Sequence, residues 1–208
     1  MEPLTTEVVA ARLESMNVGV SLEVATQLTA FLNLLEQWNR VHNLTGIRDR
    51  SELIDRHLVE SLALKPFVVG STVADVGSGG GLPGLPLAIT LPEAGFTLIE
   101  SRRKRVSFLR HVATTLGLSN VTVAHNRAEE VTAGPYATVL ARAVAPPAEL
   151  LAVTGPLIAP GGRLVMLTGE DKGQEITAIA VGFSRVAADL PGVDIKSHIV
   201  VLEREPLS

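Results

Sequence analysis

The chain has 208 residues, a formal net charge of -4, 46% hydrophobic residues and no cysteine. This length allows one domain of moderate size with a substantial core, and the lack of cysteine excludes disulfides, thiolate metal sites and a thiol nucleophile. Charge or proline interrupts every apolar run before it could span a membrane, and the acidic N-terminal stretch is unlike a secretory signal. We therefore expect a globular cytoplasmic protein that binds neither a metal nor a membrane, and that does not coat nucleic acid through bulk charge.

The first third of the chain, residues 1–70, carries apolar side chains at helical spacing. Three such stretches lie near residues 8–16, 28–38 and 53–64. Asp49 and Glu52 resemble a capping box at the start of the third stretch, and Pro66 is expected to end it. The pattern predicts an N-terminal helical cap.

In residues 71–208, short apolar runs alternate with helical stretches. The runs TVADV, FTLIE, VTVAH, ATVLAR and RLVMLT are typical of βα units with a parallel sheet covered on both faces. After one more helical stretch, QEITAIAV, the segments FSRVAADL and SHIVVLE predict an antiparallel hairpin. We predict an α/β, Rossmann-like fold with a seven-stranded, mostly parallel sheet, which differs from the six-stranded dinucleotide-binding fold.

The stretch DVGSGGGLPG at residues 75–84 places a glycine cluster between the first predicted strand and a helix that begins near Pro83. Glycines in such a turn usually let a ligand approach the main chain. The spacing of Gly79, Gly81 and Gly84 fits G-x-G-x-x-G, although glycine-rich turns also occur for purely structural reasons. The pattern alone leaves the ligand open.

Two acids narrow the choice of ligand. Glu100 ends the second predicted strand, where a carboxylate can accept hydrogen bonds from both hydroxyls of a ribose. A carboxylate at Asp75 would repel a pyrophosphate but suits a cationic ligand such as S-adenosylmethionine, which carries an ammonium and a sulfonium. Together with the glycines, these acids resemble the first two motifs of class I methyltransferases and predict S-adenosylmethionine as the cofactor.

A third candidate contact follows the third predicted strand, at residues 126–130. In a class I methyltransferase this turn lies beside the adenine, so the Ala128 amide would meet a ring nitrogen and Glu129 would accept from the exocyclic amine. A helix N-terminus stabilised by two acids is the alternative interpretation, and both can hold together.

The methyl acceptor is constrained by missing motifs. Methylation at C5 of a pyrimidine commonly needs a cysteine, and the Pro146-Pro147 pair after the fourth strand lacks the Asp or Asn and the aromatic ring of enzymes that methylate exocyclic amines. A ring nitrogen with a free lone pair, such as guanine N7, needs only alignment and electrostatic stabilisation. Small-molecule methyltransferases lack the same motifs, and no catalytic residue is assigned.

Six stretches together resemble the glucose-inhibited division protein B family, bacterial methyltransferases that modify guanine N7 in the decoding region of 16S ribosomal RNA. The stretches are WNRVHNLTGIRD at 38–49, RHLVESLAL at 56–64, DVGSGGGLPGLPLAI at 75–89, KRVSFLR at 104–110, RAEE at 127–130 and ARAVA at 141–145. The resemblance implies a class I fold, methyl transfer from S-adenosylmethionine, and 16S ribosomal RNA or the small ribosomal subunit as partner.

The resemblance also implies a cofactor site, to which the fold argument adds Glu100 and the glycine loop adds Gly79. Its members are Gly77, Leu82, Ala128, Glu129 and Arg142. Arg142 would hold the methionine carboxylate or the substrate, and Leu82 would form an apolar wall. The chain departs from the family pattern at three places, which are Glu100 for the usual aspartate, Ala141 for serine, and Thr168-Gly169 for Lys-Gly.

Candidate RNA contacts fall in two groups. Arg102 and Arg103 belong to a basic run at the start of a predicted helix, where cations oppose the helix dipole and invite a phosphate; a solvated face is the alternative. Asn43, Arg56 and His57 lie in segments specific to the resemblance. Arg56 also has the spacing of an intrahelical ion pair with Glu52 or Glu60, and a histidine on a helix is commonly structural.

Three other functions remain open from the sequence. A methyltransferase of a small molecule or a protein would fit the acidic net charge, and a nicotinamide-dependent oxidoreductase would fit the glycine spacing. A non-catalytic S-adenosylmethionine sensor would fit the same cofactor residues. The sequence does not give the oligomeric state.

Overall fold

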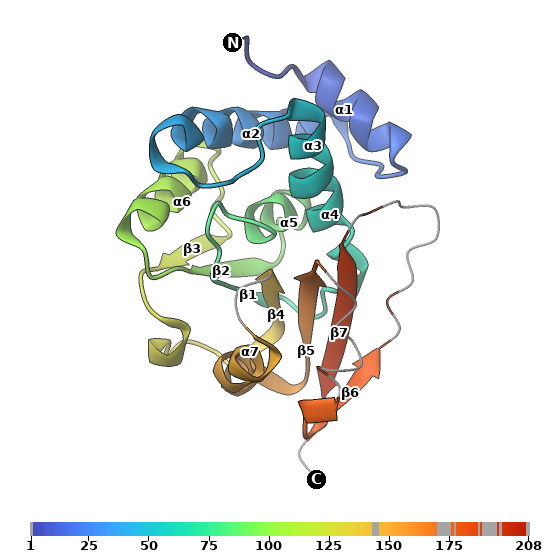
Figure 1. Cartoon of the computed structure of the whole chain (residues 1–208), viewed down its shortest axis with the longest axis vertical. Helices are drawn as coiled ribbons and strands as arrows, with labels where there is room; N and C mark the ends of the chain where they lie inside the picture. The colour runs from blue at the N-terminus through green and yellow to red at the C-terminus, as the bar shows by residue number, and fades with distance from the viewer. Residues whose placement is uncertain are drawn as a thin grey trace.

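One seven-stranded sheet organises the computed structural model, with the strand order β3-β2-β1-β4-β5-β7-β6 (Figure 1). The structure describes residues 2–142, 146–169, 178–186 and 197–206, together with Ile176, Ala188 and Ile195. The strands are β1 Thr72–Val76, β2 Gly95–Ile99, β3 Val121–Ala124, β4 Tyr136–Arg142, β5 Ile158–Thr168, β6 Phe183–Val186 and β7 His198–Arg204.

The strand pairing confirms the predicted mixed sheet. β1 to β5 run parallel, whereas β7 is antiparallel to both β5 and β6. β5 begins at Ile158 rather than at the predicted Arg163. The sequence there, Pro160-Gly161-Gly162, has the composition of a turn, and the β4–β5 register shifts beside it. The last predicted residues of the β6 stretch, 187–190, lie outside the described residues except for Ala188.

Helices cover both faces of the sheet. α5 (Gly84–Thr90) and α6 (Arg103–Thr115) lie on one face, and α7 (Pro147–Thr154) lies on the other. Side chains of β1 alternate between the two faces, so that Val73 packs with the α5 side and Val76 with the α7 side. Of the predicted helix QEITAIAV, Gln174, Glu175 and Thr177 lie outside the described residues, and Ile176, Ala178 and Ile179 are helical.

The predicted N-terminal helices are present, and the third contains an unexpected π-helical turn. The segments are α1 Thr6–Ser15, α2 Leu22–His42, α3 Arg50–Ile54, the π-helix η1 Asp55–Val59, α4 Glu60–Leu62 and the 3₁₀ turn η2 Lys65–Phe67. The Asp49 side chain accepts a hydrogen bond from the Glu52 amide at 2.9 Å, as predicted for the N-cap of the third helix. The helix ends before Pro66, which lies in η2.

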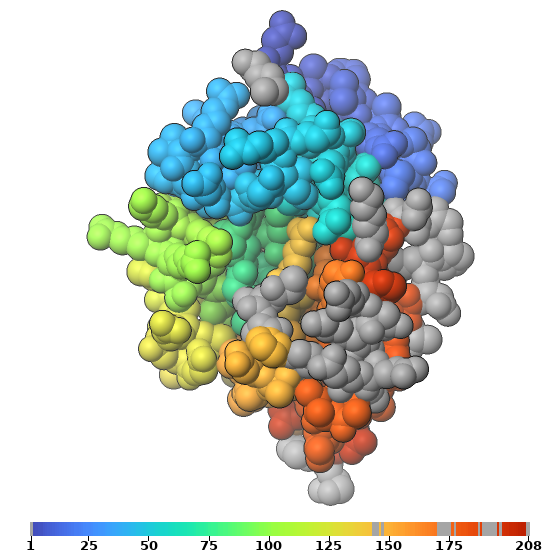
Figure 2. Space-filling model, viewed as in Figure 1, coloured from blue at the N-terminus to red at the C-terminus, as the bar shows by residue number. Residues whose placement is uncertain are grey.

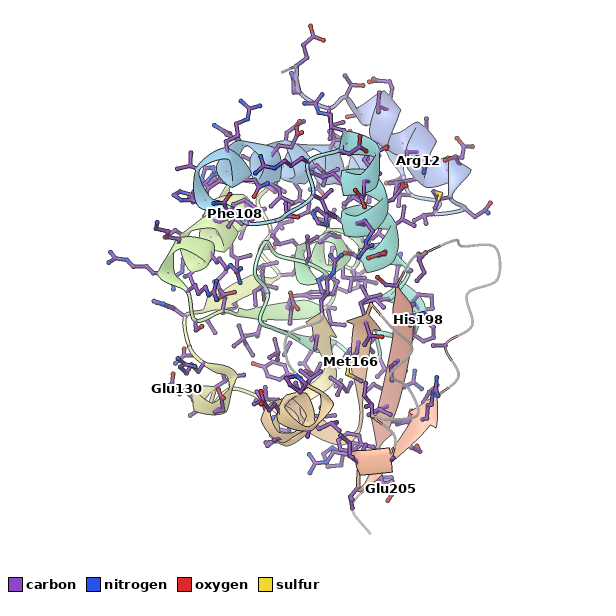
Figure 3. All side chains as sticks on the ribbon, in the orientation of Figure 1. Arg12, Phe108, Glu130, Met166, His198 and Glu205 are labelled. Atoms are coloured by element: carbon purple, nitrogen blue, oxygen red, sulfur yellow. The ribbon has the colours of Figure 1, made fainter. Side chains whose placement is uncertain are left out.

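The cap shares a hydrophobic core with the sheet. Phe31 of α2, Leu85 of α5 and Phe108 of α6 belong to one buried cluster, and Phe108 projects toward α2 (Figure 3), where its ring centroid lies 5.5 Å from that of Trp38. The strand arrows of β4 and β5 point toward the cap (Figure 1). The space-filling view shows the cap covering that end of the molecule, with α6 beside it (Figure 2). No helix in the described part is long and apolar enough to cross a membrane.

Candidate active site

The glycine loop between β1 and α5 uses its glycines for different purposes. Gly77 and Gly79 adopt left-handed φ angles of 72° and 56°. A Cβ at Gly79 would meet no atom closer than 3.7 Å, whereas a Cβ at Gly84 would lie 2.6 Å from Asp75 Oδ2 and 2.6 Å from Leu98 Cδ2. Gly84 is therefore required by packing inside the protein, whereas Gly77 and Gly79 provide the left-handed backbone of the loop.

Glu100, which directly follows β2, is held in place by the glycine loop and by the start of α6. Its Oε2 accepts a hydrogen bond from the Gly79 amide at 3.0 Å, and its Oε1 accepts one from the Arg102 amide at 2.7 Å. Arg105 Nη1 lies 3.5 Å from Oε2. Each carboxylate oxygen has a further lone pair, so Glu100 can accept hydrogen bonds from a ligand without giving up those that orient it.

A cavity of about 360 Å³ opens beside Glu100, at the carboxyl ends of β1, β2 and β3. Its wall includes four of the predicted cofactor residues, namely Gly77, Glu100, Ala128 and Glu129. Ala128 and Glu129 lie in the 3₁₀ turn η3 (Ala128–Glu130), whose last residue is labelled in Figure 3. Carboxyl ends of parallel strands are the usual ligand site of open α/β sheets, and the volume is within the range of small-molecule sites.

The cavity also has members that the sequence did not single out as cofactor contacts. Arg105 and Arg127 bring cations to its wall, and Leu150 and Val153 of α7 bring apolar surface. Glu149, in the first turn of α7, adds a carboxylate. No motif marks α7, and only knowledge of the strand order would have placed it beside β1 and β2.

Three predicted cofactor residues do not line this cavity. Gly79 lies behind Glu100, to which its amide donates. Leu82 is buried in the core that joins the cap to α5 and α6. Arg142 projects from the end of β4 toward the cap, where it contacts Arg56 and Glu60.

Asp75 has a different environment from the one expected for a direct partner of a cationic ligand. It is 1% exposed, it does not line the cavity, and its Oδ2 accepts the Gly84 amide at 3.2 Å. Its Oδ1 has no hydrogen-bond partner among the described residues. Burial raises the pKa of Asp75 to about 7. The carboxyl group thus lies under the glycine loop and supports the start of α5.

A second group of charges lies on the cap side of β4. Arg142 Nη2 donates to the Arg56 carbonyl at 2.9 Å and to Glu60 Oε2 at 3.2 Å. Arg56 Nε lies 3.0 Å from Glu60 Oε1, which confirms the intrahelical pair allowed by the sequence spacing. Burial lowers the pKa of Arg142, and the charge of Glu60 opposes that shift. The two arginines therefore share one buried carboxylate.

His57 and Asn43, both predicted RNA contacts, have contrasting positions. His57 is 3% exposed and its Nε2 shares a 2.9 Å hydrogen bond with Thr45 Oγ1. Burial, with the Arg142 charge as the next cause, lowers the pKa of His57 to about 4, so it is neutral at physiological pH. Asn43 is exposed and ends α2 with a left-handed φ of 49°. Of these two, only Asn43 has a side chain at the surface.

Arg102 and Arg103 lie exposed at the start of α6, with no ion pair among the residues that the structure describes. Arg102 also lines the cavity. From Ser101 to Ala128 the chain contains six Lys or Arg residues and no acid, although its overall charge is -4. This segment is the strongest concentration of positive charge along the chain.

The residues present fit S-adenosylmethionine better than a dinucleotide. Glu100 offers oriented acceptors for a ribose, and the η3 turn offers the Ala128 amide and the Glu129 carboxylate to a purine edge. The three carboxylates of the cavity wall, from Glu100, Glu129 and Glu149, are matched by three arginines, so the wall has no net positive charge to attract a pyrophosphate. The antiparallel β7 also differs from the all-parallel dinucleotide-binding sheet.

Comparison with known proteins finds a matching family model and similar curated relatives. Residues 24–185 match the family model GidB, described as rRNA small subunit methyltransferase G. Two relatives bear the name ribosomal RNA small subunit methyltransferase G. The protein of Xanthomonas campestris pv. campestris (strain 8004) is 41% identical over 192 residues, 90% of each chain. The protein of Aromatoleum aromaticum is 40% identical over 208 residues, 94% of this chain and 99% of that one.

Solved structures agree on the fold. A methyltransferase from Geobacter sulfurreducens superimposes with a TM-score of 0.62 at 16% identity and covers 99% of both chains. A SAM-dependent methyltransferase from Aquifex aeolicus gives a TM-score of 0.57 at 19% identity, with 82% of this chain and 97% of that one covered.

Proposed function

The chain belongs to the rRNA small subunit methyltransferase G family, and we propose that it transfers a methyl group from S-adenosylmethionine to N7 of a guanine in the decoding region of 16S ribosomal RNA. The observation that carries the proposal is the cavity beside Glu100. Two backbone amides fix the Glu100 carboxylate at the wall of this cavity, where it can accept hydrogen bonds from a ribose. The reaction takes place in the cytoplasm, with the small ribosomal subunit or its RNA as partner.

The chain's own residues bind and orient the cofactor. Glu100 accepts from the ribose hydroxyls, the Ala128 amide and Glu129 meet the adenine edge, and Gly77 lets the ligand approach the backbone. Leu150 of α7 supplies apolar surface. When bound, S-adenosylmethionine supplies an electrophilic methyl group. Arg142 binds an anionic oxygen near the reaction centre, and the same end of β4 faces the cap.

No proton has to be removed at guanine N7, because its lone pair is free. The protein therefore needs to align the acceptor and stabilise charge rather than supply a general base. This requirement agrees with the titratable groups near β4, since His57 is buried, neutral and bonded to Thr45. The absence of cysteine excludes a covalent cysteine adduct of the kind used at pyrimidine C5.

RNA docks beside the cavity through the start of α6. Arg102 borders the cavity and Arg103 follows it, both exposed, so phosphates of the strand that carries the target can contact them. Asn43 lies exposed at the end of α2, a helix that packs against α6. Arg56 is paired with the buried Glu60, which makes it a weaker candidate for a direct phosphate contact.

The test is transfer of radiolabelled methyl groups from S-adenosylmethionine to small subunits that lack the modification, followed by nucleoside analysis of the RNA. We expect label in 7-methylguanosine from 16S RNA. Label in another nucleoside would overturn the N7 assignment but keep the enzyme class. Binding of the cofactor with no transfer to subunits or free 16S RNA would favour a small-molecule methyltransferase or a sensor instead.

A further inference from the structure

Glu60 is an acid that the sequence analysis did not place in any site. It begins α4 directly after the π-helix η1 and is 1% exposed. Its two oxygens face different arginines, with Oε1 3.0 Å from Arg56 Nε and Oε2 3.2 Å from Arg142 Nη2. Because Arg142 ends β4, 82 residues further along the chain, Glu60 ties the cap to the carboxyl edge of the sheet.

A buried ion pair of this kind is a poor way to gain stability alone. Removing charges from water costs several kcal/mol per ion, and apolar side chains of similar size often stabilise a protein as well or better. The π-helical turn that precedes Glu60 is also a rare geometry that occurs frequently at functional sites. Both features suggest that Glu60 has a purpose beyond holding the cap in place.

The geometry of Arg142 indicates that purpose. Glu60 and the Arg56 carbonyl both bind the same nitrogen, Nη2. The other two guanidinium nitrogens, Nε and Nη1, have no hydrogen-bond partner among the described residues. Ala141 pairs with Val76, so Arg142 lies level with Gly77, which lines the cavity. A guanidinium anchored through one nitrogen presents its remaining donors in a fixed direction.

We propose that Glu60 is a positioning residue, which fixes the guanidinium of Arg142 so that its free donors bind an anionic oxygen at the carboxyl edge of β1 and β4. The oxygen belongs either to the α-carboxylate of the cofactor or to a phosphate of the RNA, and both accept from a guanidinium in the same way. The inference rests on the proposed function, because it assigns Arg142 to the same reaction.

Glu60→Gln is the direct test, because it keeps the shape of the side chain and replaces one acceptor oxygen by an amide that repels a guanidinium. Calorimetric titration of the variant with S-adenosylmethionine, without RNA, tests whether Arg142 binds the cofactor carboxylate. Steady-state methylation of small subunits at saturating cofactor tests whether Arg142 binds an RNA phosphate. We expect either the cofactor Kd or the KM for subunits to rise about tenfold, as for the loss of one charge-assisted hydrogen bond.

The matched control is Asp55→Asn, another acid-to-amide change one turn earlier. Asp55 pairs with Arg12 of α1, at 2.8 Å and 2.6 Å, and contacts neither Arg56 Nε nor Arg142. We expect it to lower the melting temperature and to leave both Kd and KM unchanged. If Glu60→Gln behaves in the same way, Glu60 is merely structural and the inference is overturned.

Two further variants keep the test decisive if Glu60→Gln folds poorly. Glu60→Asp retains the charge, so it should fold. Its shorter side chain should still raise whichever constant Glu60→Gln raises, the cofactor Kd or the KM for subunits. Combining Glu60→Gln with Arg142→Gln should add nothing to the effect of Arg142→Gln alone, because Glu60 acts through Arg142. Additive effects would contradict this. Failure of the wild-type protein to bind S-adenosylmethionine or methylate RNA would instead reject the proposed function.

Discussion

On the α7 side of the sheet, the cavity beside Glu100 is bordered by charges at the surface, with Arg102 and Glu129 exposed. On the cap side, Glu60, Asp75 and His57 are each no more than 3% exposed. Arg102 and Glu129 are solvated and free to exchange partners with a ligand, whereas Glu100 is 5% exposed and held by two amides. Side chains on the second side have lost their water, and burial shifts the pKa values of Asp75 and His57 away from their ordinary values. The first side is suited to binding, and the second to holding groups in fixed positions.

The largest effects should be two opposing contributions to the pH dependence of stability, both from the cap side. Asp75 has a pKa of about 7 in the folded protein and 3.8 as its ordinary value, so unfolding between pH 4 and 7 releases a proton and stability falls as pH rises. His57 has a pKa of about 4 against an ordinary 6.5, so unfolding in that window takes up a proton and stability rises with pH. Each contribution is on the order of 3 to 4 kcal/mol, and they nearly cancel.

Single substitutions should expose the two contributions. His57→Gln removes the His57 contribution, so its unfolding free energy should fall relative to wild type from pH 4 to 6.5. Asp75→Asn removes the Asp75 contribution, so its stability should rise relative to wild type from pH 4 to 7. Denaturant titrations at several pH values measure both slopes. If unfolding free energy changes with pH in the same way in all three proteins, the pKa values of Asp75 and His57 are not shifted by burial.

The second prediction concerns the cavity side. Glu100→Ala removes the acceptor for the ribose hydroxyls and for the Gly79 and Arg102 amides. The Kd for S-adenosylmethionine should rise about 100-fold, because hydrogen bonds to an ionised carboxylate are among the stronger ones. Glu93→Ala is the matched control, since Glu93 is exposed in the turn before β2, at the other end of that strand. Equal affinities of the two variants would remove Glu100 from the site.

The cavity side was also the easier one to predict from the sequence. The glycine loop, Glu100 and the η3 turn follow strands whose apolar runs are distinct, and carboxyl ends of parallel strands always meet at one edge. The Arg142–Glu60 contact joins residues 82 positions apart, and no pattern in either segment predicts that the two side chains meet. Apolar spacing also does not distinguish the π-helical turn of Asp55–Val59 from an α-helix. Leu82 illustrates the same limit, because only the packing of the cap shows that it faces the core.

Between the two sides lies the glycine loop, and its glycines offer a third test. Gly84→Ala places a Cβ 2.6 Å from Asp75 Oδ2 and from Leu98 Cδ2, so we expect a loss of about 1 to 3 kcal/mol of unfolding free energy by overpacking. Gly19→Ala, where a Cβ would meet no atom within 4 Å, is the control. Denaturant unfolding measures both. Unchanged stability of Gly84→Ala would show that Asp75 and α5 can move apart without cost, against the rigid network described above.

The smallest effect should come from the solvated cations of α6. Arg103 is exposed and does not line the cavity, so Arg103→Ala should lower the slope of log affinity for RNA against log salt by about 1 and leave the cofactor Kd unchanged. Adding Arg102→Ala should lower the slope by about 1 more. Arg185→Ala removes an exposed cation from β6, at the opposite edge of the sheet from β3, and should leave the slope near the wild-type value. If all three variants lowered the slope equally, RNA affinity would depend on the net charge of the protein, and the start of α6 would not be a specific contact for RNA phosphates.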